Sequence, residues 1–166
     1  IRQEVIIGGM FSPEILIDIL RNFTLFMEIK AGKEIKVICR YQQYRAVGKM
    51  IERLNSGKSW QERSGVIWHT QGSGKSLTMV MLAQAIALEK SIRNPKIVLV
   101  TDRTDLDNQI TGTFRKCGRF VENASTGQRL VELLESKSDA VVTTIINKFV
   151  AAMKKMNKPL ESHDIF

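Results

Sequence analysis

The chain has 166 residues, of which 43% are hydrophobic and 25% charged, so it has the size and composition of one globular domain and not of a disordered or fibrous protein. No stretch approaches the roughly 18 uncharged residues of a membrane-spanning helix, and the N-terminus lacks the features of a signal peptide, so we expect a cytoplasmic protein without membrane contact. Its 25 Lys and Arg against 17 Asp and Glu give a formal net charge of +8, the sign expected of a surface that meets phosphate.

The first third of the chain predicts two helices and one strand. Ser12-Pro13-Glu14 has the residue types of a helix start, and apolar residues follow at helical spacing at positions 16, 19, 20, 23 and 26. Residues 34–39 predict a strand, and a second helix runs from Tyr41 to Asn55-Ser56-Gly57. Residues 56–64 are polar and predict a loop. Cys39 and Cys117 do not have a metal-binding spacing and are expected to be buried free thiols.

From Gly65 onward, short apolar strands alternate with helices. Residues 66–68 predict a strand, residues 77–88 a helix and residues 97–100 a second strand, which together form a βαβ unit. A helix follows with apolar residues at positions 106, 110 and 114, another opens at Ser125-Thr126-Gly127-Gln128, residues 140–142 predict a strand and residues 145–156 a helix. This alternation predicts an α/β fold with a mostly parallel sheet covered by helices on both faces.

The main chemical motif lies between the predicted strand 66–68 and the helix that follows it. Gly72-Ser73-Gly74-Lys75-Ser76 is a phosphate-binding loop, in which glycines let successive amides converge on a phosphate at the start of a helix. Lys75 can reach the β- and γ-phosphates of a nucleotide, and the Ser76 hydroxyl suits Mg²⁺. The pattern GxxxxGK[ST] has Gly where this chain has His69, which we interpret as a residue that shapes the loop.

Several segments resemble the restriction (motor) subunit of type I restriction-modification enzymes, a superfamily 2 DNA translocase. They are GVIWHTQGSGKSLTM at residues 65–79, VLVTDRTDLDNQ at 98–109, RYQQYRAV at 40–47, VVTTIINKF at 141–149 and FSPEILIDILRNF at 11–23, so the resemblance covers nearly the whole chain. It implies a RecA-like P-loop NTPase fold of three layers, with ATP and Mg²⁺ as cofactors. Residues 1–58 would be a helical lead-in with an adenine-side motif, and residues 59–166 an incomplete first ATPase lobe.

The resemblance also implies roles for particular residues around the nucleotide. Arg40, Tyr41 and Gln43 would surround the adenine, although the start of an amphipathic helix explains these three equally well. Gln42 departs from the family pattern, so the glutamine that contacts adenine is left open. The residues expected at the phosphates are Thr70, Gln71, Gly72, Ser73, Gly74, Lys75, Ser76 and Leu77, with Lys75 and Ser76 as the catalytic pair and Ser76 as the Mg²⁺ ligand.

A second set of residues is implied for double-stranded DNA. Thr101-Asp102-Arg103 follows a predicted strand, and Thr143 and Thr144 end the next one, where loops of a parallel sheet form its working edge. These residues would hold the DNA backbone without reading bases. The simpler interpretation, that Thr101 or Asp102 caps the next helix, is compatible with this role.

Hydrolysis also needs an acidic pair that orders Mg²⁺ and water. Asp102 superficially resembles one, but Arg103 stands where a motor has Glu. In the family a segment like His163-Asp164-Ile165-Phe166 leads into the strand of the DEAH box, so this chain is expected to stop before it and to be inactive alone. The parent would be an ATP-dependent type I deoxyribonuclease that works with specificity and methyltransferase subunits.

Two other functions fit the phosphate loop. One is a P-loop kinase, for which Arg115 and Arg119 are the available lid arginines. The other is a non-catalytic module that binds a nucleotide or DNA.

Overall fold

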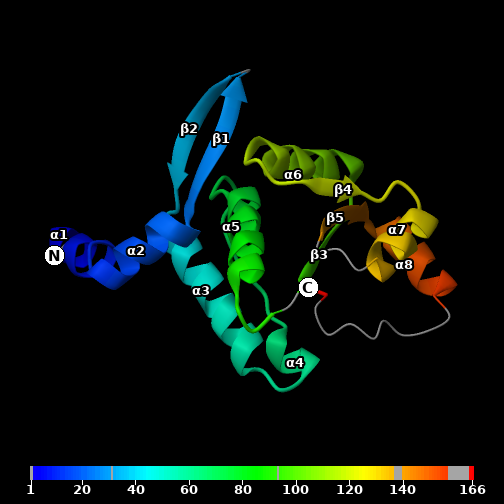
Figure 1. The fold of residues 1–166 in the computed structure, drawn as a ribbon, viewed down its shortest axis with the longest axis horizontal. Helices are drawn as coiled ribbons and strands as arrows, with labels where there is room; N and C mark the ends of the chain where they lie inside the picture. Colours follow the sequence, from blue (N-terminus) through cyan, green and yellow to red (C-terminus); the bar gives the residue numbers. More distant parts are fainter. Residues whose placement is uncertain (1, 31, 93, 137–139, 157–164) are drawn as a thin grey trace. The chain divides into compact units, whose positions relative to one another are not determined.

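The computed structural model describes residues 2–30, 32–92, 94–136, 140–156 and 165–166. The chain forms two compact units, Ile1–Ala85 and Ile86–Phe166, and the boundary between them falls inside one helix (Figure 1). Each unit is described by itself. The division at residues 58 and 59 that the motifs suggest is a different one and stays a prediction.

Unit 1 is mostly helical, with one two-stranded ribbon. Its elements in chain order are α1 (Arg2–Val5), the π-helix η1 (Ile6–Met10), α2 (Pro13–Asn22), β1 (Thr24–Lys30), β2 (Lys33–Ile38), α3 (Tyr41–Ser56), α4 (Trp60–Arg63) and the greater part of α5 (Lys75–Leu88). The predicted bounds of α3 are confirmed. The short helix α4 lies where the sequence predicted only a loop.

The predicted first helix is shorter than its apolar pattern suggested. α2 ends at Asn22, where the Phe23 amide and the Thr24 hydroxyl both donate to the carbonyl of Ile19. Phe26 belongs to β1, which pairs antiparallel with β2 from Thr24↔Ile38 to Lys30↔Lys33. The segment Thr24–Lys30 is rich in residues that favour strands, and a partner strand a few residues away allows it to pair.

The predicted strand at residues 66–68 does not form. Neither sheet of the described residues includes this segment, and Val66 and Trp68 are 91% and 90% exposed. A strand exists only when a neighbour completes its hydrogen-bond ladder, and apolar residues alone cannot supply that neighbour. The predicted βαβ unit is therefore wrong as stated, although its helix and its second strand are present.

Unit 2 is a three-layer α/β structure. Its elements are β3 (Lys96–Thr101), α6 (Thr104–Lys116), β4 (Val121–Asn123), α7 (Gly127–Glu135), β5 (Ala140–Ile145) and α8 (Ile146–Lys155). The strands are parallel in the order β3-β5-β4. Thr143 of β5 contacts Thr111 of α6, whereas Val142 packs in the core of α7 and α8, so the helices cover opposite faces. The predicted α/β fold class is confirmed.

The sheet of unit 2 extends beyond β3. Ile165 forms a parallel bridge with Lys96, and the Val98 amide donates to the Phe166 carbonyl at 2.7 Å. Of the predicted segment at residues 163–166, His163 and Asp164 lie outside the described residues. β4 is only three residues long, and the sequence did not predict it.

The side chain of a buried lysine, Lys96 of β3, caps the C-terminal end of α7. Lys96 is 5% exposed, and its ammonium donates to the carbonyls of Leu133 (2.7 Å), Leu134 (2.9 Å) and Ser136. Leu133 and Leu134 belong to the last turn of α7 and Ser136 is its C-cap residue, so the ammonium lies at the helix end where a positive charge is favourable. Burial lowers the pKa of Lys96.

Candidate functional site

The loop before α5 presents free backbone amides at a helix start. Gly72 and Gly74 have φ angles of +74° and +86°, in the left-handed region that glycine adopts readily. Within the described residues, the amides of Lys75, Ser76 and Leu77 have no hydrogen-bond acceptor, and that of Thr78 is the first to bond, to the Gly74 carbonyl at 3.0 Å. Amides that converge at the positive end of a 14-residue helix make a site for an anion.

Lys75 lies across this loop. Its ammonium donates to the carbonyls of His69 at 3.0 Å and Thr70 at 2.8 Å, and its side chain is exposed. His69 therefore contacts Lys75 through its main-chain carbonyl, which agrees with the interpretation of His69 as a residue that shapes the loop. Thr70, Gln71 and Gly72 are exposed, and Ser76 is partly buried next to Lys75.

Gln43 holds the loop in this shape. It is 4% exposed, its Nε2 donates to the Gly74 carbonyl at 3.1 Å, and its Oε1 accepts from the Arg40 amide at 2.8 Å. The Thr78 amide and hydroxyl donate to the same Gly74 carbonyl, the hydroxyl at 3.2 Å. A Cβ atom on Gly74 would lie 2.9 Å from Nε2 of Gln43. The sequence placed Gln43 at the adenine, and the structure places its amide against the phosphate loop.

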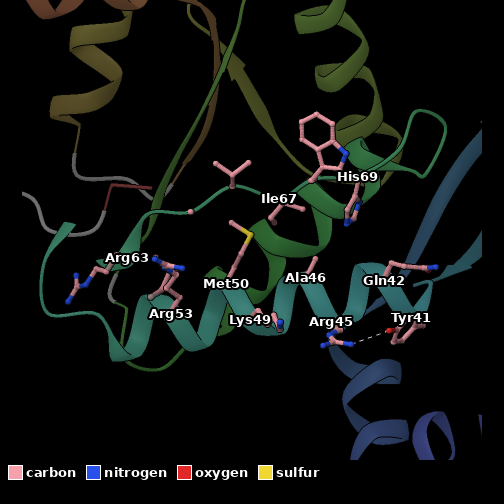
Figure 2. Close-up of a pocket in the computed structure, with 14 residues that line it drawn as sticks. Tyr41, Gln42, Arg45, Ala46, Lys49, Met50, Arg53, Arg63, Ile67 and His69 are labelled. Atoms are coloured by element: carbon pink, nitrogen blue, oxygen red, sulfur yellow. Dashed lines mark hydrogen bonds between the residues drawn. The ribbon is translucent and has the colours of Figure 1, made fainter. Parts of the chain in front are cut away.

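Two adjoining cavities lie beside the loop in unit 1. The smaller, of about 280 Å³, is lined by Met50, Gly65, Ile67, His69, Lys75, Thr78, Met79 and Leu82. The larger, of about 500 Å³, is a groove along α3 and shares Met50, Gly65, Ile67 and His69 with the smaller one (Figure 2). Gln42 and Tyr41 line the groove, and Tyr41 is 66% exposed. The smaller cavity is lined mostly by apolar residues and lies beside Lys75.

Phe23, Cys39 and the partly buried Tyr44 pack around the start of α3. Phe23 and Tyr44 pack with ring centroids 4.7 Å apart. Burial, with a further contribution from Asp18, raises the pKa of Tyr44 to about 12 and that of Cys39 to about 11. Cys39 and Cys117 are free and buried, as the sequence predicted.

The residues predicted at the DNA backbone lie at the carboxyl edge of the sheet in unit 2. Asp102 and Arg103 are exposed and form an ion pair of 3.3 Å. Thr101 is buried, and its hydroxyl donates to the Arg103 carbonyl at 3.3 Å and lies 3.5 Å from the Thr144 carbonyl. Arg103 is the N-cap residue of α6. The structure thus brings these three residues together in front of α6.

Thr143 and Thr144 are placed differently from what a direct DNA contact needs. The two residues, main chain included, are 0% and 1% exposed. The Thr143 hydroxyl bonds to Thr111 at 3.0 Å and to Asn123 at 3.1 Å, and Asn123 also donates to Asp107 at 2.5 Å. This buried network links α6, β4 and β5. No sequence motif indicated it, because its members are 16 to 32 residues apart. DNA contact by the two threonines stays a prediction, and it would require a rearrangement, because both residues are buried in the central strand of the sheet.

Metal clusters and membrane-spanning helices are both absent from the described part of the chain. It contains no group of three His, Cys, Asp or Glu side chains arranged to hold a metal ion. None of its helices combines the length and the apolar character that crossing a membrane requires.

Comparison with known proteins places the chain among ATPases. Residues 42–166 match the family described as SWI2/SNF2 ATPase. The type I restriction enzyme HindI endonuclease subunit of Haemophilus influenzae is 34% identical over 166 residues, which cover 95% of this chain and 16% of that protein. The SauCOLORF180P endonuclease subunit of Staphylococcus aureus strain COL is 31% identical over 136 residues, which cover 81% of this chain and 14% of that protein. The SsaAORF53P endonuclease subunit of Staphylococcus saprophyticus is 28% identical over 146 residues, which cover 87% of this chain and 15% of that protein. This chain spans about one sixth of the HindI subunit.

Proposed function

We propose, on the premise that this chain belongs to the SWI2/SNF2 ATPase family, that its phosphate loop binds ATP with Mg²⁺ and that it is the ATP-binding part of a DNA-translocating motor. The observation that carries the proposal is the row of free amides at the start of α5, with Lys75 beside it. The glycine geometry at Gly72 and Gly74 and the brace from Gln43 hold those amides in one arrangement.

Each residue of the loop has a definite task in this proposal. The amides of Gly74 through Leu77 bind phosphate oxygens, and Lys75 exchanges its two carbonyl contacts for the β- and γ-phosphates. The Ser76 hydroxyl is a ligand for Mg²⁺. Bound Mg²⁺ neutralises charge on the phosphates. Tyr41 and Arg40, both exposed, are the groups available to an adenine near Gln43.

Titration with a fluorescent ATP analogue tests the nucleotide site. Lys75→Ala should weaken binding by about 10- to 100-fold, because it removes charge-assisted hydrogen bonds to phosphate. Lys90→Ala is the matched control, since Lys90 is also an exposed lysine but lies after α5. Equal affinities of the wild type and Lys75→Ala would refute the phosphate-site assignment. Ser76→Ala should leave binding without Mg²⁺ unchanged and reduce the gain in affinity that Mg²⁺ produces.

We also propose that the Thr101-Asp102-Arg103 turn contacts the DNA backbone. Arg103 is 79% exposed at its side chain, and the amides at the start of α6 lie next to it. Arg103→Ala should weaken binding of non-specific duplex. It should also reduce the salt slope, which is the slope of log affinity against log salt concentration, by about 0.9, the value for one phosphate contact. Asp102→Ala should act in the opposite direction, because it removes a negative charge beside Arg103. A salt slope that neither variant changes would refute this contact.

At the level of the whole protein, we propose the motor subunit of a type I restriction endonuclease. The similar proteins are named type I restriction enzyme endonuclease subunits, and this chain corresponds to about one sixth of the HindI subunit. ATP-driven translocation along double-stranded DNA, cleavage, and association with specificity and methyltransferase subunits in the cytoplasm are therefore proposals for the complete protein. Purification of the complete protein with its neighbouring gene products, followed by an ATP-dependent DNA cleavage assay, would test them.

A further inference from the structure

A row of cations follows one side of α3. Arg45, Lys49 and Arg53 are exposed and stand four residues apart, so the helical rise spaces them by about 6 Å and the row spans about 12 Å. All three line the groove of about 500 Å³, together with Arg63 from the end of α4 (Figure 2). The row runs away from the phosphate loop, and the nucleotide proposal does not use it.

The arginines of this groove are held in position through one nitrogen each. Nε of Arg53 donates to the Glu62 carbonyl at 2.6 Å, and Nε of Arg63 donates to the Gly57 carbonyl at 2.9 Å. Arg45 Nη1 donates to the Tyr41 hydroxyl at 3.2 Å. The terminal nitrogens of Arg53 and Arg63 make no further hydrogen bond within the described residues. These guanidinium groups are therefore oriented and still able to donate.

The positive charge of the groove is not neutralised by ion pairs. The nearby carboxylates are Glu52 of α3 and Glu62 of α4, and Glu62 accepts from the Lys58 amide at 2.7 Å. Neither carboxylate lies within 4.0 Å of a cationic nitrogen of Arg45, Lys49 or Arg53 in the described part of the chain. The four cations of the groove exceed these two anions, which leaves a net attraction for a polyanion.

An exposed tryptophan completes the groove. Trp68 is 90% exposed and belongs to its lining, whereas Tyr41 at the start of α3 is assigned to the adenine. A solvent-exposed indole has a face free for stacking, and stacking on aromatic side chains combined with a positive groove is how proteins bind single strands without sequence preference. A duplex keeps its bases stacked inside and cannot use this face.

We propose that the α3 groove binds a single-stranded nucleic acid, with its phosphates along Arg45, Lys49 and Arg53 and a base stacked on Trp68. The three cations stand about 6 Å apart along the helix, so each can contact a different phosphate of an extended strand. The proposal does not depend on ATP binding. It adds to the motor a contact that can hold a strand separately from the turn at Arg103.

Fluorescence anisotropy with a labelled oligothymidine at several salt concentrations tests the charged row. The double substitution Arg45→Gln with Lys49→Gln should make the salt slope shallower by about 1.4, from about 0.7 per phosphate contact. The control removes two exposed lysines of the β1–β2 hairpin, Lys30→Gln with Lys33→Gln, and should leave the slope unchanged. Equal slopes for the two double variants would overturn the proposal.

The stacking contact has its own matched pair of variants. Trp68→Ala should weaken oligothymidine binding roughly tenfold. Trp60→Ala should not, because Trp60 is 74% exposed but is not part of the groove lining. Lys75→Ala should bind the oligonucleotide like the wild type, which separates this proposal from the nucleotide site. Displacement of the oligonucleotide by an ATP analogue would assign the groove to the nucleotide and overturn the proposal, as would preferential binding of duplex.

Discussion

Replacement of Gly74 by alanine tests whether Gln43 braces the phosphate loop. At φ +86°, any residue with a Cβ is strained by about 1–2 kcal/mol. The new methyl group would also lie 2.9 Å from Nε2 of Gln43, which must move and lose its hydrogen bond to the Gly74 carbonyl. Gln43 is 4% exposed, so leaving its amide without a partner costs a further ~1–3 kcal/mol. We expect Gly74→Ala to destabilise unit 1 by about 2–5 kcal/mol.

Gly72→Ala provides the matched control. Gly72 has a similar φ of +74°, but no atom lies within 4 Å of its added Cβ. This variant should therefore cost only the backbone strain of about 1–2 kcal/mol. Urea unfolding followed by circular dichroism measures the two losses, and hydrogen exchange at α3 and α5 shows where they act.

A double-mutant cycle with Gln43→Ala isolates the contact itself. In the Gln43→Ala background the methyl group at residue 74 meets no amide, so Gly74→Ala should then cost about as much as Gly72→Ala. A coupling energy of about 1–3 kcal/mol between residues 43 and 74 is expected. Equal costs for Gly72→Ala and Gly74→Ala, or zero coupling, would refute the brace.

Three further outcomes follow from buried groups elsewhere. Lys96→Met should lower the free energy of unfolding by about 1–3 kcal/mol in urea titrations, because the carbonyls that end α7 lose their donor. The pKa of Cys39 is raised from 9.0 to about 11 and that of Tyr44 from 10.0 to about 12. The folded state therefore favours the neutral forms of both side chains. Their contribution to the stability of unit 1 is fully present below pH 9.0 for Cys39 and below pH 10.0 for Tyr44, and it is lost as the pH rises through 11 and 12. Tyr44→Phe should flatten that loss in urea titrations at pH 8 to 12, and an unchanged pH dependence would argue against it. Thr143→Val should destabilise unit 2 by about 1–3 kcal/mol in thermal or urea unfolding, whereas Thr144→Val should cost less, because the hydroxyl of Thr144 has no hydrogen-bond partner among the described residues. Equal losses for the two threonines would contradict the network.

Local signals in the sequence predicted the features that are themselves local. The start of α5 at Lys75, the turns at Gly72 and Gly74, and the bounds of α3 follow from glycines, caps and helical periodicity within a few residues. The basic row on α3 could also be read from its four-residue spacing. Such features depend on backbone preferences and on side chains one turn apart, and these act before the chain packs.

The partners of each element were decided only in three dimensions. The sequence contains Gln43, but its bond to Gly74 joins residues 31 apart, and the contact between Thr111 and Thr143 spans 32. Likewise, residues 66–68 have the composition of a strand but pair with no other described segment, whereas the three residues of β4 pair because β5 lies beside them. The order of residues sets what each segment can form. Hydrogen-bond partners and burial depend on which distant segment arrives next to it, and that is a property of the packed chain.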